Sequence, residues 1–300
     1  MILLLSCVQN SWKWPHIQEN WLHPSNIPYV ILVGNPQIPR SSYKYDASSH
    51  ILQLGCQDNY DEIVHKIAYG ISAVVELFDP LYIFKIDDDV IINVPLLHAF
   101  MQSNPTLFDD VDIHHRIQER SGRTLFGRIS NNIPENDVGV CRNIVNEEDT
   151  EIFKEDSNER MEFGGILYGG VVANVHKSSI CSFGCDKYTF PKNKTPIKIH
   201  PVVYCGGPIY YLKKPAMNIL SQLMDPDSMV YEDMNVGKTL NSNGIHPVNL
   251  PLYTNDFTDF KRNNSIGWHD VNREHTQNIF VKKYKSQTSL MQSRFSDIRG

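Results

Sequence analysis

The sequence predicts an α/β fold with a Rossmann-like, mixed central sheet flanked by helices, and three observations lead to this prediction. Four short apolar runs in the first hundred residues have the length of strands and end in polar or glycine residues. A segment between the third and fourth runs carries apolar residues at helical spacing. Strand-like and helix-like segments therefore alternate along the chain, which is typical of layered α/β domains.

The four strand candidates are apolar along most of their length. Such runs are expected for strands that are covered on both faces. They are Ile2–Val8 ("ILLLSCV"), Tyr29–Gly34 ("YVILVG"), His50–Gly55 ("HILQLG") and Leu81–Ile86 ("LYIFKI"). The opening "MILLLSCVQN" lacks the basic flank of a signal peptide and is too short to span a bilayer. We therefore expect a buried first strand there, and no membrane span in the rest of the chain.

Two helices are predicted in the same part of the chain. Apolar residues recur at helical spacing from Ile63 to Val74, which gives the first helix one buried stripe. After the fourth strand, Asn93 can cap a second helix that has Pro95 in its first turn and runs to about Gln102.

The second part of the chain begins with a change in amino-acid composition at residues 104–162. The acidic "NEEDTEIFKEDSNERME" and the turn-forming "SNNIPEND" predict a long surface excursion. Strands are then expected at Gly164–Val175 and Val202–Leu212, followed by a helix from Pro215 to about Leu223. A last helix is predicted from Glu232 to Asn241, where Asn-Gly supplies the stop.

Composition and charge narrow the function classes. The chain has 41% hydrophobic and 21% charged residues, as in ordinary soluble globular proteins, and its net charge of -6 argues against nucleic-acid binding. Six cysteines scattered over 300 residues do not require a disulfide framework. Cys181 and Cys185 near His176 could be part of a zinc site, although the spacing and the missing fourth ligand disfavour it.

Three consecutive aspartates are the first residues that suggest chemistry. Asp87, Asp88 and Asp89 directly follow an apolar strand, and ligands of open α/β sheets bind beyond the carboxyl ends of strands. Two carboxylates in an Asp-x-Asp pattern can hold a hard divalent cation, directly or through its water shell. The alternative is a solvated acidic turn or a helix-capping cluster.

Three further segments suggest a site together with the aspartates. Asp233 in the first turn of the last helix is favoured as an ion by the helix macrodipole and could act as a general base; the alternative is simple capping by Glu232 and Asp233. Gly206-Gly207 permits close backbone approach, or forms a tight turn or bulge. His269 could bind a divalent transition metal, or be an ordinary surface or core histidine.

These segments resemble, in order and spacing, the beta-1,3-galactosyltransferase and fringe family of inverting glycosyltransferases, which have the glycosyltransferase A-type fold. The resemblance is densest from His50 to Phe100, with "HILQLGCQDNYDEIVHKIAYGI" and "YIFKIDDDVIIN". There the family has a strand, Asp-x-Tyr, a helix with Leu-x-x-Lys, and a strand that runs into Asp-Asp-Asp. The later "YGGVV", "DKYTF", "YCGGPIYYL" and "YEDMNVGKTLNSNGI" resemble its Gly-Gly segment and its Glu-Asp-Val-x-x-Gly helix.

The resemblance implies a role for each matched residue. The catalytic base would be Asp233. The metal ligands would be Asp89 directly, Asp87 through water, and His269. The donor nucleotide would be bound by Asp88 at the ribose and by Asp58, Lys66, Val8 and Gln9. The donor and acceptor cleft would be lined by Gly206, Gly207, Glu232 and Trp268.

The resemblance also implies the reaction. It would be a metal-dependent, inverting transfer of galactose, N-acetylglucosamine, glucose or a similar sugar from a nucleotide-diphosphate donor, UDP-linked, to a hydroxyl of a glycan or glycoconjugate. Mixed carboxylate and imidazole ligation favours Mn²⁺ as the cofactor, with Mg²⁺ as the alternative. One glycosyltransferase domain would cover residues 1–300: a nucleotide-binding half (about 1–103), the excursion (104–162), an acceptor-side half (163–280) and a C-terminal tail (281–300).

The sequence departs from the family in two respects. "WKWPHIQENW" has Gln18 and Asn20 where the family has the Arg and Thr of Arg-x-Thr-Trp, and keeps only Trp21, which bears on how the nucleotide is held. Family members are anchored in the Golgi by an N-terminal span and stem, whereas this sequence begins on its first strand. We expect a cytoplasmic enzyme, or one in the Golgi or another secretory lumen if an anchor precedes the sequence.

Two other functions stay open. A non-catalytic chaperone or lectin-like relative on the same fold would be expected to lose the aspartates or the base, and this chain keeps both. A metal-dependent phosphohydrolase could use the aspartates for phosphate ester cleavage. It would leave the Glu-Asp helix and the Gly-Gly segment unexplained.

Overall fold

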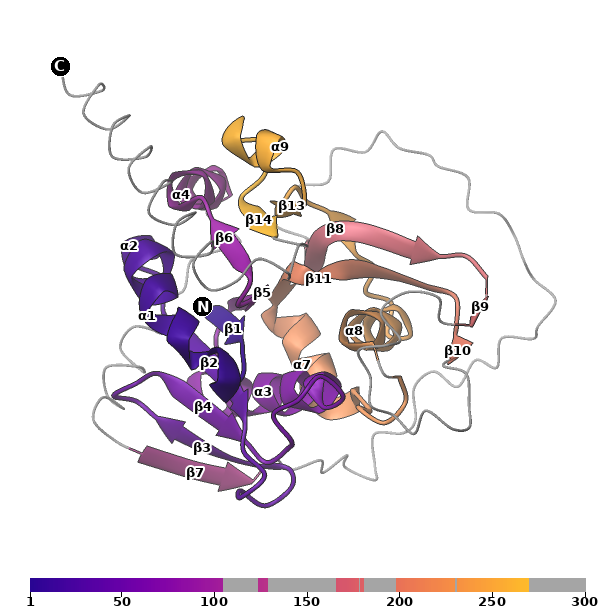
Figure 1. Ribbon diagram of the computed structural model, residues 1–300. Coiled ribbons are helices and arrows are strands. Elements are labelled where there is room, and N and C mark those ends of the chain that lie inside the picture. Colours follow the sequence, from indigo (N-terminus) through magenta and orange to yellow (C-terminus); the bar gives the residue numbers. More distant parts are fainter. Residues whose placement is uncertain (105–123, 129–165, 178, 181–197, 230, 270–300) are drawn as a thin grey trace.

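The computed structural model describes residues 1–104, 124–128, 166–177, 179–180, 198–229 and 231–269 (Figure 1). Within these residues the largest sheet has nine strands in the order β12-β8-β11-β5-β1-β2-β4-β3-β7. The four strands predicted in the first hundred residues all lie in it: β1 (Ile2–Leu5), β2 (Tyr29–Gly34), β4 (Ile51–Leu54) and β5 (Tyr82–Asp87). The predicted α/β class is therefore confirmed.

The sheet is mixed. β1 lies between β2 and β5 and is parallel to both, and β2 is parallel to β4. Beyond β5, β11 (Val202–Lys213) is antiparallel to β5 and to β8 (Tyr168–Val175), and β12 (Val248–Asn249) is parallel to β8. At the other edge, β3 (Ser42–Asp46) is antiparallel to β4 and to β7 (Thr124–Arg128). Strands from both predicted halves of the chain share this one sheet.

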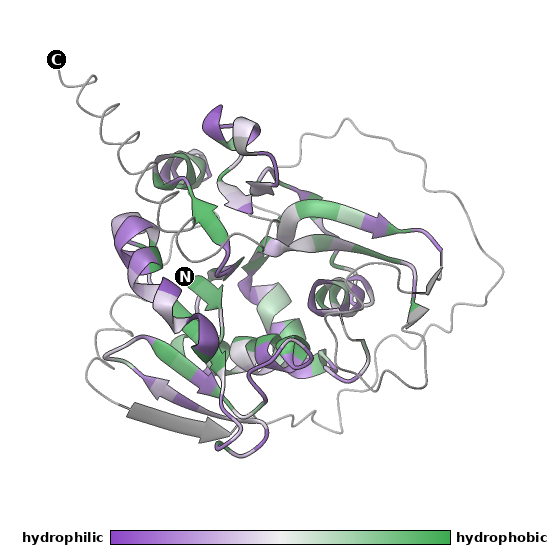
Figure 2. Cartoon of the chain, viewed as in Figure 1, coloured by the Kyte–Doolittle hydropathy of each residue, from purple (hydrophilic) through white to green (hydrophobic). Residues whose placement is uncertain are grey.

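Helices cover both faces of the sheet (Figure 1). Helices α3 (Ile63–Phe78), α7 (Lys214–Leu223) and α8 (Glu232–Asn241) pack on one face with Leu3 and Leu5 of β1. Successive residues of a strand point to opposite faces, so Ile2 and Leu4 join the core on the other face. Cover on both sides explains why the predicted strands are apolar along most of their length. In Figure 2, green marks the hydrophobic residues of the sheet and its helices.

The other face is covered by the N-terminal helical run and by α4. The run comprises η1 (Val8–Lys13), α1 (Trp14–Ile17), η2 (Gln18–Leu22) and α2 (His23–Ser25). Helix α4 (Val94–Ser103) begins as predicted, because the Asn93 side chain accepts a hydrogen bond from the N–H of Leu96. Among the described residues, no helix is long and apolar enough to cross a membrane.

Short strands complete the fold. β6 (Val90–Ile92), β14 (Gly267–His269) and β13 (Tyr253–Thr254) form a small sheet, next to α9 (Phe257–Lys261). A two-stranded sheet joins β9 (Ser179–Ile180) and β10 (Lys198–Ile199). In β14, His269 lies opposite Val90, which immediately follows the three aspartates. This pairing brings the C-terminal histidine to the turn formed by Asp87, Asp88 and Asp89, the aspartate turn.

The structure corrects two predictions. The first strand ends at Leu5 rather than Val8, because the chain turns there into the helical run. The strand β7 lies inside the predicted surface excursion, so that part of the excursion is an edge strand of the central sheet. The rest of the excursion, the Cys181–Cys185 pair and the C-terminal tail lie outside the described residues.

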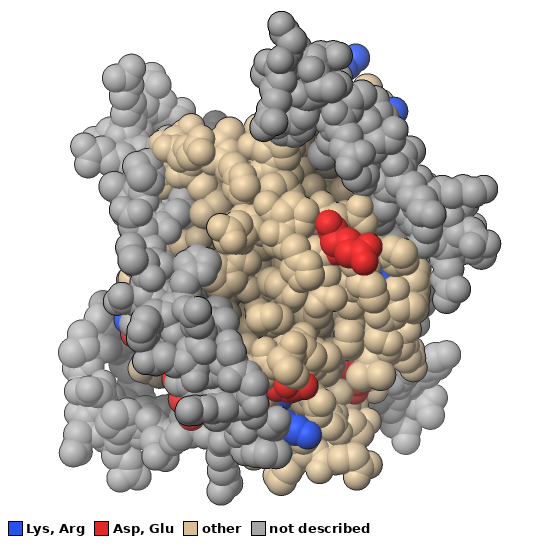
Figure 3. All heavy atoms as spheres, turned by 90° about the vertical axis from the view of Figure 1, so that its left-hand side faces the viewer, with Lys and Arg blue, Asp and Glu red and all other residues tan. Residues whose placement is uncertain are grey.

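The surface agrees with the acidic composition. On the face shown in Figure 3, the Lys and Arg side chains of the described residues are scattered and form no continuous basic patch. The net charge of the whole sequence is -6.

Candidate active site

The three consecutive aspartates occupy three different environments. Asp87 ends β5, and its Oδ1 lies 2.6 Å from Nζ of Lys85, two residues back on the same face of the strand. Asp88 points to the opposite face, toward the N-terminal helical run. Asp89 follows in the turn before β6, and its Oδ1 lies 3.6 Å from Nε2 of His269. Each carboxylate has its own cationic or hydrogen-bonding neighbour, which offsets their mutual repulsion.

The Asp89–His269 pair fits a divalent cation. His269 Nδ1 lies 3.0 Å from Oδ1 of Asn255, and this contact requires the hydrogen to be on Nδ1. The other ring nitrogen, Nε2, faces Asp89. The His269 and Asp89 side chains are 17% and 20% exposed, with Oδ1 of Asp89 itself buried. A carboxylate oxygen beside an imidazole nitrogen is a donor set that Mn²⁺ accepts.

Asp87, the third predicted ligand, is bound by Lys85 instead. Charge interactions from Asp89 and His269 still reach Asp87, so the three residues are neighbours. Burial raises the pKa of Asp87 to about 6, although the Lys85 ammonium opposes the shift. Within the described part of the chain, no three or more His, Cys, Asp or Glu side chains are grouped as a ready metal site. The metal role of these residues stays a prediction.

Lys85 is the buried cation of the site, and its side chain is 1% exposed. Its Nζ donates a hydrogen bond of 2.6 Å to the carbonyl oxygen of Gly207 and lies 3.5 Å from Oε2 of Glu232. Burial acts to lower the pKa of Lys85, but the charges of Asp87 and Glu232 outweigh it and raise the pKa. The sequence analysis missed this residue, because a lysine inside an apolar run carries no pattern of its own.

Asp233 lies half-buried in the first turn of α8. Its Oδ2 accepts a hydrogen bond of 3.1 Å from the N–H of Gly207, and its Oδ1 accepts one of 2.8 Å from the N–H of Met234. Burial raises the pKa of Asp233, opposed by Lys85 and by these N–H groups. A raised pKa makes a carboxylate a stronger base, which is the property that a proton acceptor needs.

Two residues predicted to line the cleft are buried. Glu232 is 7% exposed and accepts a hydrogen bond from the hydroxyl of Tyr210, and its carboxylate lies beside Lys85. Burial raises the pKa of Glu232 to about 7. Trp268 is 5% exposed and packs near Phe260, with 6.5 Å between the ring centroids, because its large ring is accommodated in the core.

Gly206 and Gly207 lie at an irregularity in the β11–β8 pairing, and each passes close to another residue of the site. The register between β11 and β8 shifts between Cys205 and Tyr210, on either side of the pair. A side chain at Gly206 would collide with the hydroxyl of Tyr253, whereas a Cβ at Gly207 would lie 3.5 Å from Oδ2 of Asp233.

Tyr253 also links the glycines to the histidine. Its ring lies edge-on to the ring of His269, with 6.2 Å between the centroids. Gly206 and Gly207, the glycine segment, are therefore adjacent to Asp233. Through this tyrosine they are also adjacent to the Asp89–His269 pair.

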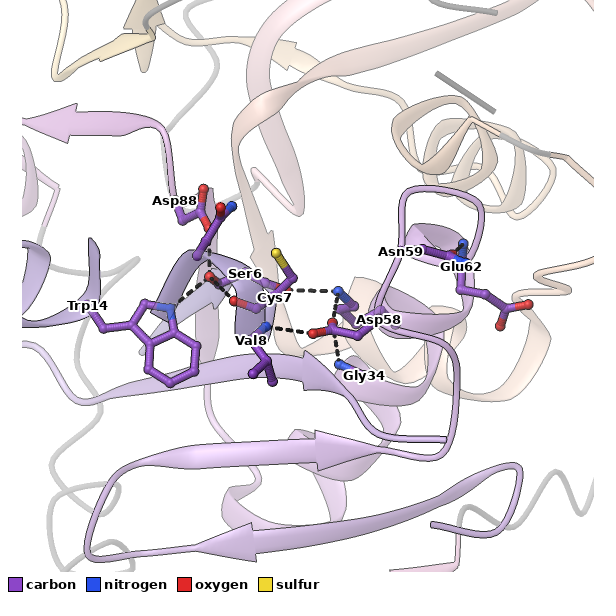
Figure 4. A network of polar contacts seen from close by, with 11 residues as sticks. Ser6, Cys7, Val8, Trp14, Gly34, Asp58, Asn59, Glu62 and Asp88 are labelled. Carbon is purple, nitrogen blue, oxygen red and sulfur yellow. Dashed lines mark hydrogen bonds and ion pairs between the residues drawn. The ribbon is translucent and has the colours of Figure 1, made fainter. Parts of the chain in front are cut away.

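The residues predicted to shape the nucleotide site gather at the carboxyl end of β1 (Figure 4). Asp58 Oδ1 accepts hydrogen bonds of 2.7 Å from the N–H of Gly34 and from Nζ of Lys66. Asp58 Oδ2 accepts one of 2.6 Å from the N–H of Val8. Lys66 also donates to the carbonyl of Ser6 over 2.8 Å. These contacts hold the ends of β1 and β2 to the start of α3.

Asp88 fastens the N-terminal helical run to the aspartate turn. Its carboxylate accepts hydrogen bonds from Ser6 Oγ (2.6 Å), Asn10 Nδ2 (2.9 Å) and Lys13 Nζ (2.8 Å). Trp14 Nε1 donates to Ser6 Oγ over 2.8 Å, and Figure 4 shows Trp14, Ser6 and Asp88 together. Asp88 is 7% exposed and its carboxylate is occupied by these contacts, and its predicted contact with a ribose stays a prediction. Its partners were missed because they lie far away in the sequence.

Val8 and Gln9 lie between the contacts made by Asp58 and those made by Asp88. Val8 is 56% exposed, which is unusual for a branched apolar residue, and Gln9 is exposed as well. The turn that carries them is held by Asp58 on one side and by Asp88 on the other. The structure thus places all the predicted nucleotide residues around one exposed turn.

Residues 13–125 match the family model described as Galactosyltransferase. This confirms the predicted family resemblance over these residues, which include Asp58, Lys66 and the three aspartates, while Asp233 and His269 lie outside the match. The match supports a hexosyltransferase, with glycosyl transfer as the reaction and a sugar donor and a glycan acceptor as the implied partners. The mixed sheet flanked by helices is consistent with the predicted glycosyltransferase A-type fold.

Searches of curated proteins and of solved structures complete the comparison. No curated protein matches the chain. A crystal structure of a glycosyltransferase involved in the glycosylation of the major capsid of PBCV-1 aligns with 95% of this chain and 98% of that chain, at 9% identity and a TM-score of 0.39.

Proposed function

We propose that this protein is a metal-dependent, inverting glycosyltransferase that moves a sugar from a UDP-linked donor to a hydroxyl of a glycan or glycoconjugate. One observation carries the proposal: Asp233 and the Asp89–His269 pair flank the same glycine segment. A proton acceptor and a cation-binding pair on two sides of one half-buried backbone segment are what this reaction requires.

Asp233 is the base of the proposed reaction. Its carboxylate takes the proton of the acceptor hydroxyl, which attacks the anomeric carbon from the face opposite the leaving diphosphate and so inverts the configuration. The N–H groups of Gly207 and Met234 each hold one of its oxygens, which fixes the orientation of the carboxylate. General-base catalysis of this kind contributes about 10²–10⁴-fold.

Asp89 and His269 would hold the cation, with Asp87 assisting through water. When bound, a divalent cation supplies Lewis-acid neutralisation of the charge on the leaving diphosphate. The mixed oxygen and nitrogen ligands favour Mn²⁺ over Mg²⁺.

The exposed turn at Val8 and Gln9 would receive the nucleotide. It lies at the carboxyl ends of the parallel strands β1, β2 and β5, where ligands of open α/β sheets bind. Asp58 and Lys66 hold this turn in place, and both fall within the residues that match the galactosyltransferase family.

A screen of nucleotide sugars tests the proposal. Binding of UDP-sugars is measured by calorimetry with and without Mn²⁺, and the donor that binds is then assayed with a panel of glycans. We expect manganese-dependent binding and, by NMR, a product with inverted anomeric configuration. Donor hydrolysis at the same rate with and without acceptor would favour a phosphohydrolase, and a complete lack of donor binding would favour a non-catalytic relative.

A further inference from the structure

We propose that Lys85 is a positioning residue that ties the base Asp233 to the aspartate turn; this inference rests on the proposed function. The ammonium of Lys85 lies 2.6 Å from Oδ1 of Asp87 and donates a hydrogen bond of 2.6 Å to the carbonyl of Gly207. The N–H of the same glycine holds Asp233. One lysine and one glycine thus connect the turn that would bind the cation to the carboxylate that would take the proton.

The glycine segment depends on this anchor because the flanking strands do not hold it. The register between β11 and β5 begins at Ile209, and the register between β11 and β8 is interrupted between Cys205 and Tyr210. Residues 206–208 therefore lie outside both registers. The Lys85 ammonium reaches this stretch from the neighbouring strand β5 and binds the carbonyl of Gly207 at its centre.

A purely structural ion pair would not require the bond to Gly207. An ammonium that is 1% exposed would be strongly disfavoured without a counter-charge, and Asp87 and Glu232 supply that charge at 2.6 and 3.5 Å. Charge balance is then already achieved. The further bond to the glycine carbonyl is the contact that turns the lysine into a support for the base.

The experiment removes the lysine in a charge-matched background. Lys85→Met combined with Glu232→Gln deletes one buried positive and one buried negative charge, and Glu232→Gln alone is the parent. The double variant has the net charge of the wild type, and we expect it to keep the manganese-dependent UDP binding of the parent, while its melting temperature falls because Asp87 loses its cation. Its kcat should fall by roughly 100-fold, since small displacements of a catalytic group have effects of that size. Hydrogen exchange of the peptide covering 204–212 should become faster.

Two results would overturn the proposal. Equal kcat in the double variant and its parent would show that Lys85 only balances the buried negative charge and does not position Asp233. A loss of kcat with unchanged hydrogen exchange at 204–212 would show that the lysine does not hold the glycine segment. If the methionine is not tolerated, Lys85→Gln in the same background repeats the test, because its shorter, uncharged amide is expected to show the same losses.

Lys66 provides the matched control. It is 2% exposed and, like Lys85, binds a carboxylate and a backbone carbonyl, here those of Asp58 and Ser6 near the predicted nucleotide residues, whereas Lys85 has a second carboxylate neighbour in Glu232. Lys66→Met is expected to raise the KM for the donor and to leave exchange at 204–212 unchanged. If the wild-type protein transfers no sugar, the proposed function fails. The exchange measurement still tests the link between Lys85 and Gly207 by itself.

Discussion

The N–H of Gly207 donates a hydrogen bond of 3.1 Å to Oδ2 of Asp233. The glycine belongs to the irregular part of β11, and the aspartate to the first turn of α8. The orientation of the proposed base therefore depends on how the helix end is seated against the strand. Substitutions on either side of this contact test that dependence.

The two glycines are expected to respond differently to an added methyl group. Gly206→Ala would push against the hydroxyl of Tyr253, whereas Gly207→Ala places its Cβ 3.5 Å from Oδ2 of Asp233, an ordinary contact distance. We expect the first substitution to lower kcat/KM more than the second. Steady-state kinetics on both variants measure this. Equal losses would show that Tyr253 moves aside without consequence for the reaction.

The cation site is expected to depend on Asp89 and His269 separately. Asp89→Ala and His269→Ala each remove one donor from the pair, so both variants should lose manganese-dependent binding of UDP in calorimetric titrations. His98→Ala is a suitable control, because that histidine instead contacts the carbonyl of Ser25. Unchanged titration curves for Asp89→Ala would contradict the metal assignment.

The contacts of Asp58 are expected to contribute to both stability and donor binding. Asp58→Ala removes the carboxylate that accepts hydrogen bonds from the N–H groups of Val8 and Gly34 and from the ammonium of Lys66. Lys66 then keeps the carbonyl of Ser6 as an acceptor. The free energy of unfolding should fall by about 1–3 kcal/mol, and the KM for the donor should rise. Urea denaturation and kinetics measure the two effects. An unchanged donor KM despite lower stability would remove this network from the nucleotide site.

The pH dependence of stability is expected to carry a contribution from Glu232. Burial raises its pKa from an ordinary 4.5 to about 7. Between these values the folded state binds the proton more tightly than the unfolded state, so this contribution to the free energy of unfolding falls as the pH rises. Urea denaturation of the wild type and Glu232→Gln across this window isolates the contribution. Parallel curves for the two proteins would be inconsistent with it.

Elements with strong local sequence signals were predictable from the sequence. The bounds of α8 were predicted to the residue, because an acidic first turn starts the helix and Gly244, with φ of 76°, follows its end. The strands β1 and β2 were recognisable because burial on both faces leaves an unbroken apolar run, and β4 and β5 because they are apolar along most of their length. The short strands β6 and β14 carry no such signal, since their stability comes from pairing with residues far along the chain.

The electrostatic partners in the site could not be predicted in the same way. Lys85 lies 122 residues from Gly207 and 147 from Glu232, and no local pattern indicates that they meet. The partners of Asp88 are also distant, with Ser6 82 residues away. Family resemblance led to the carboxylates, but only the fold shows which cation and which backbone groups each one contacts.

Asp233→Asn is the measurement that tests the central claim most directly. The replacement has nearly the same shape, and its carbonyl oxygen can still accept the N–H of Gly207, but it cannot take a proton from the acceptor hydroxyl. Asp256→Asn is the control, since Asp256 caps α9 at the exposed surface. We expect Asp233→Asn to keep manganese-dependent donor binding while sugar transfer falls by about 10²–10⁴-fold or more. Substantial transfer by this variant would contradict the assignment of Asp233 as the base.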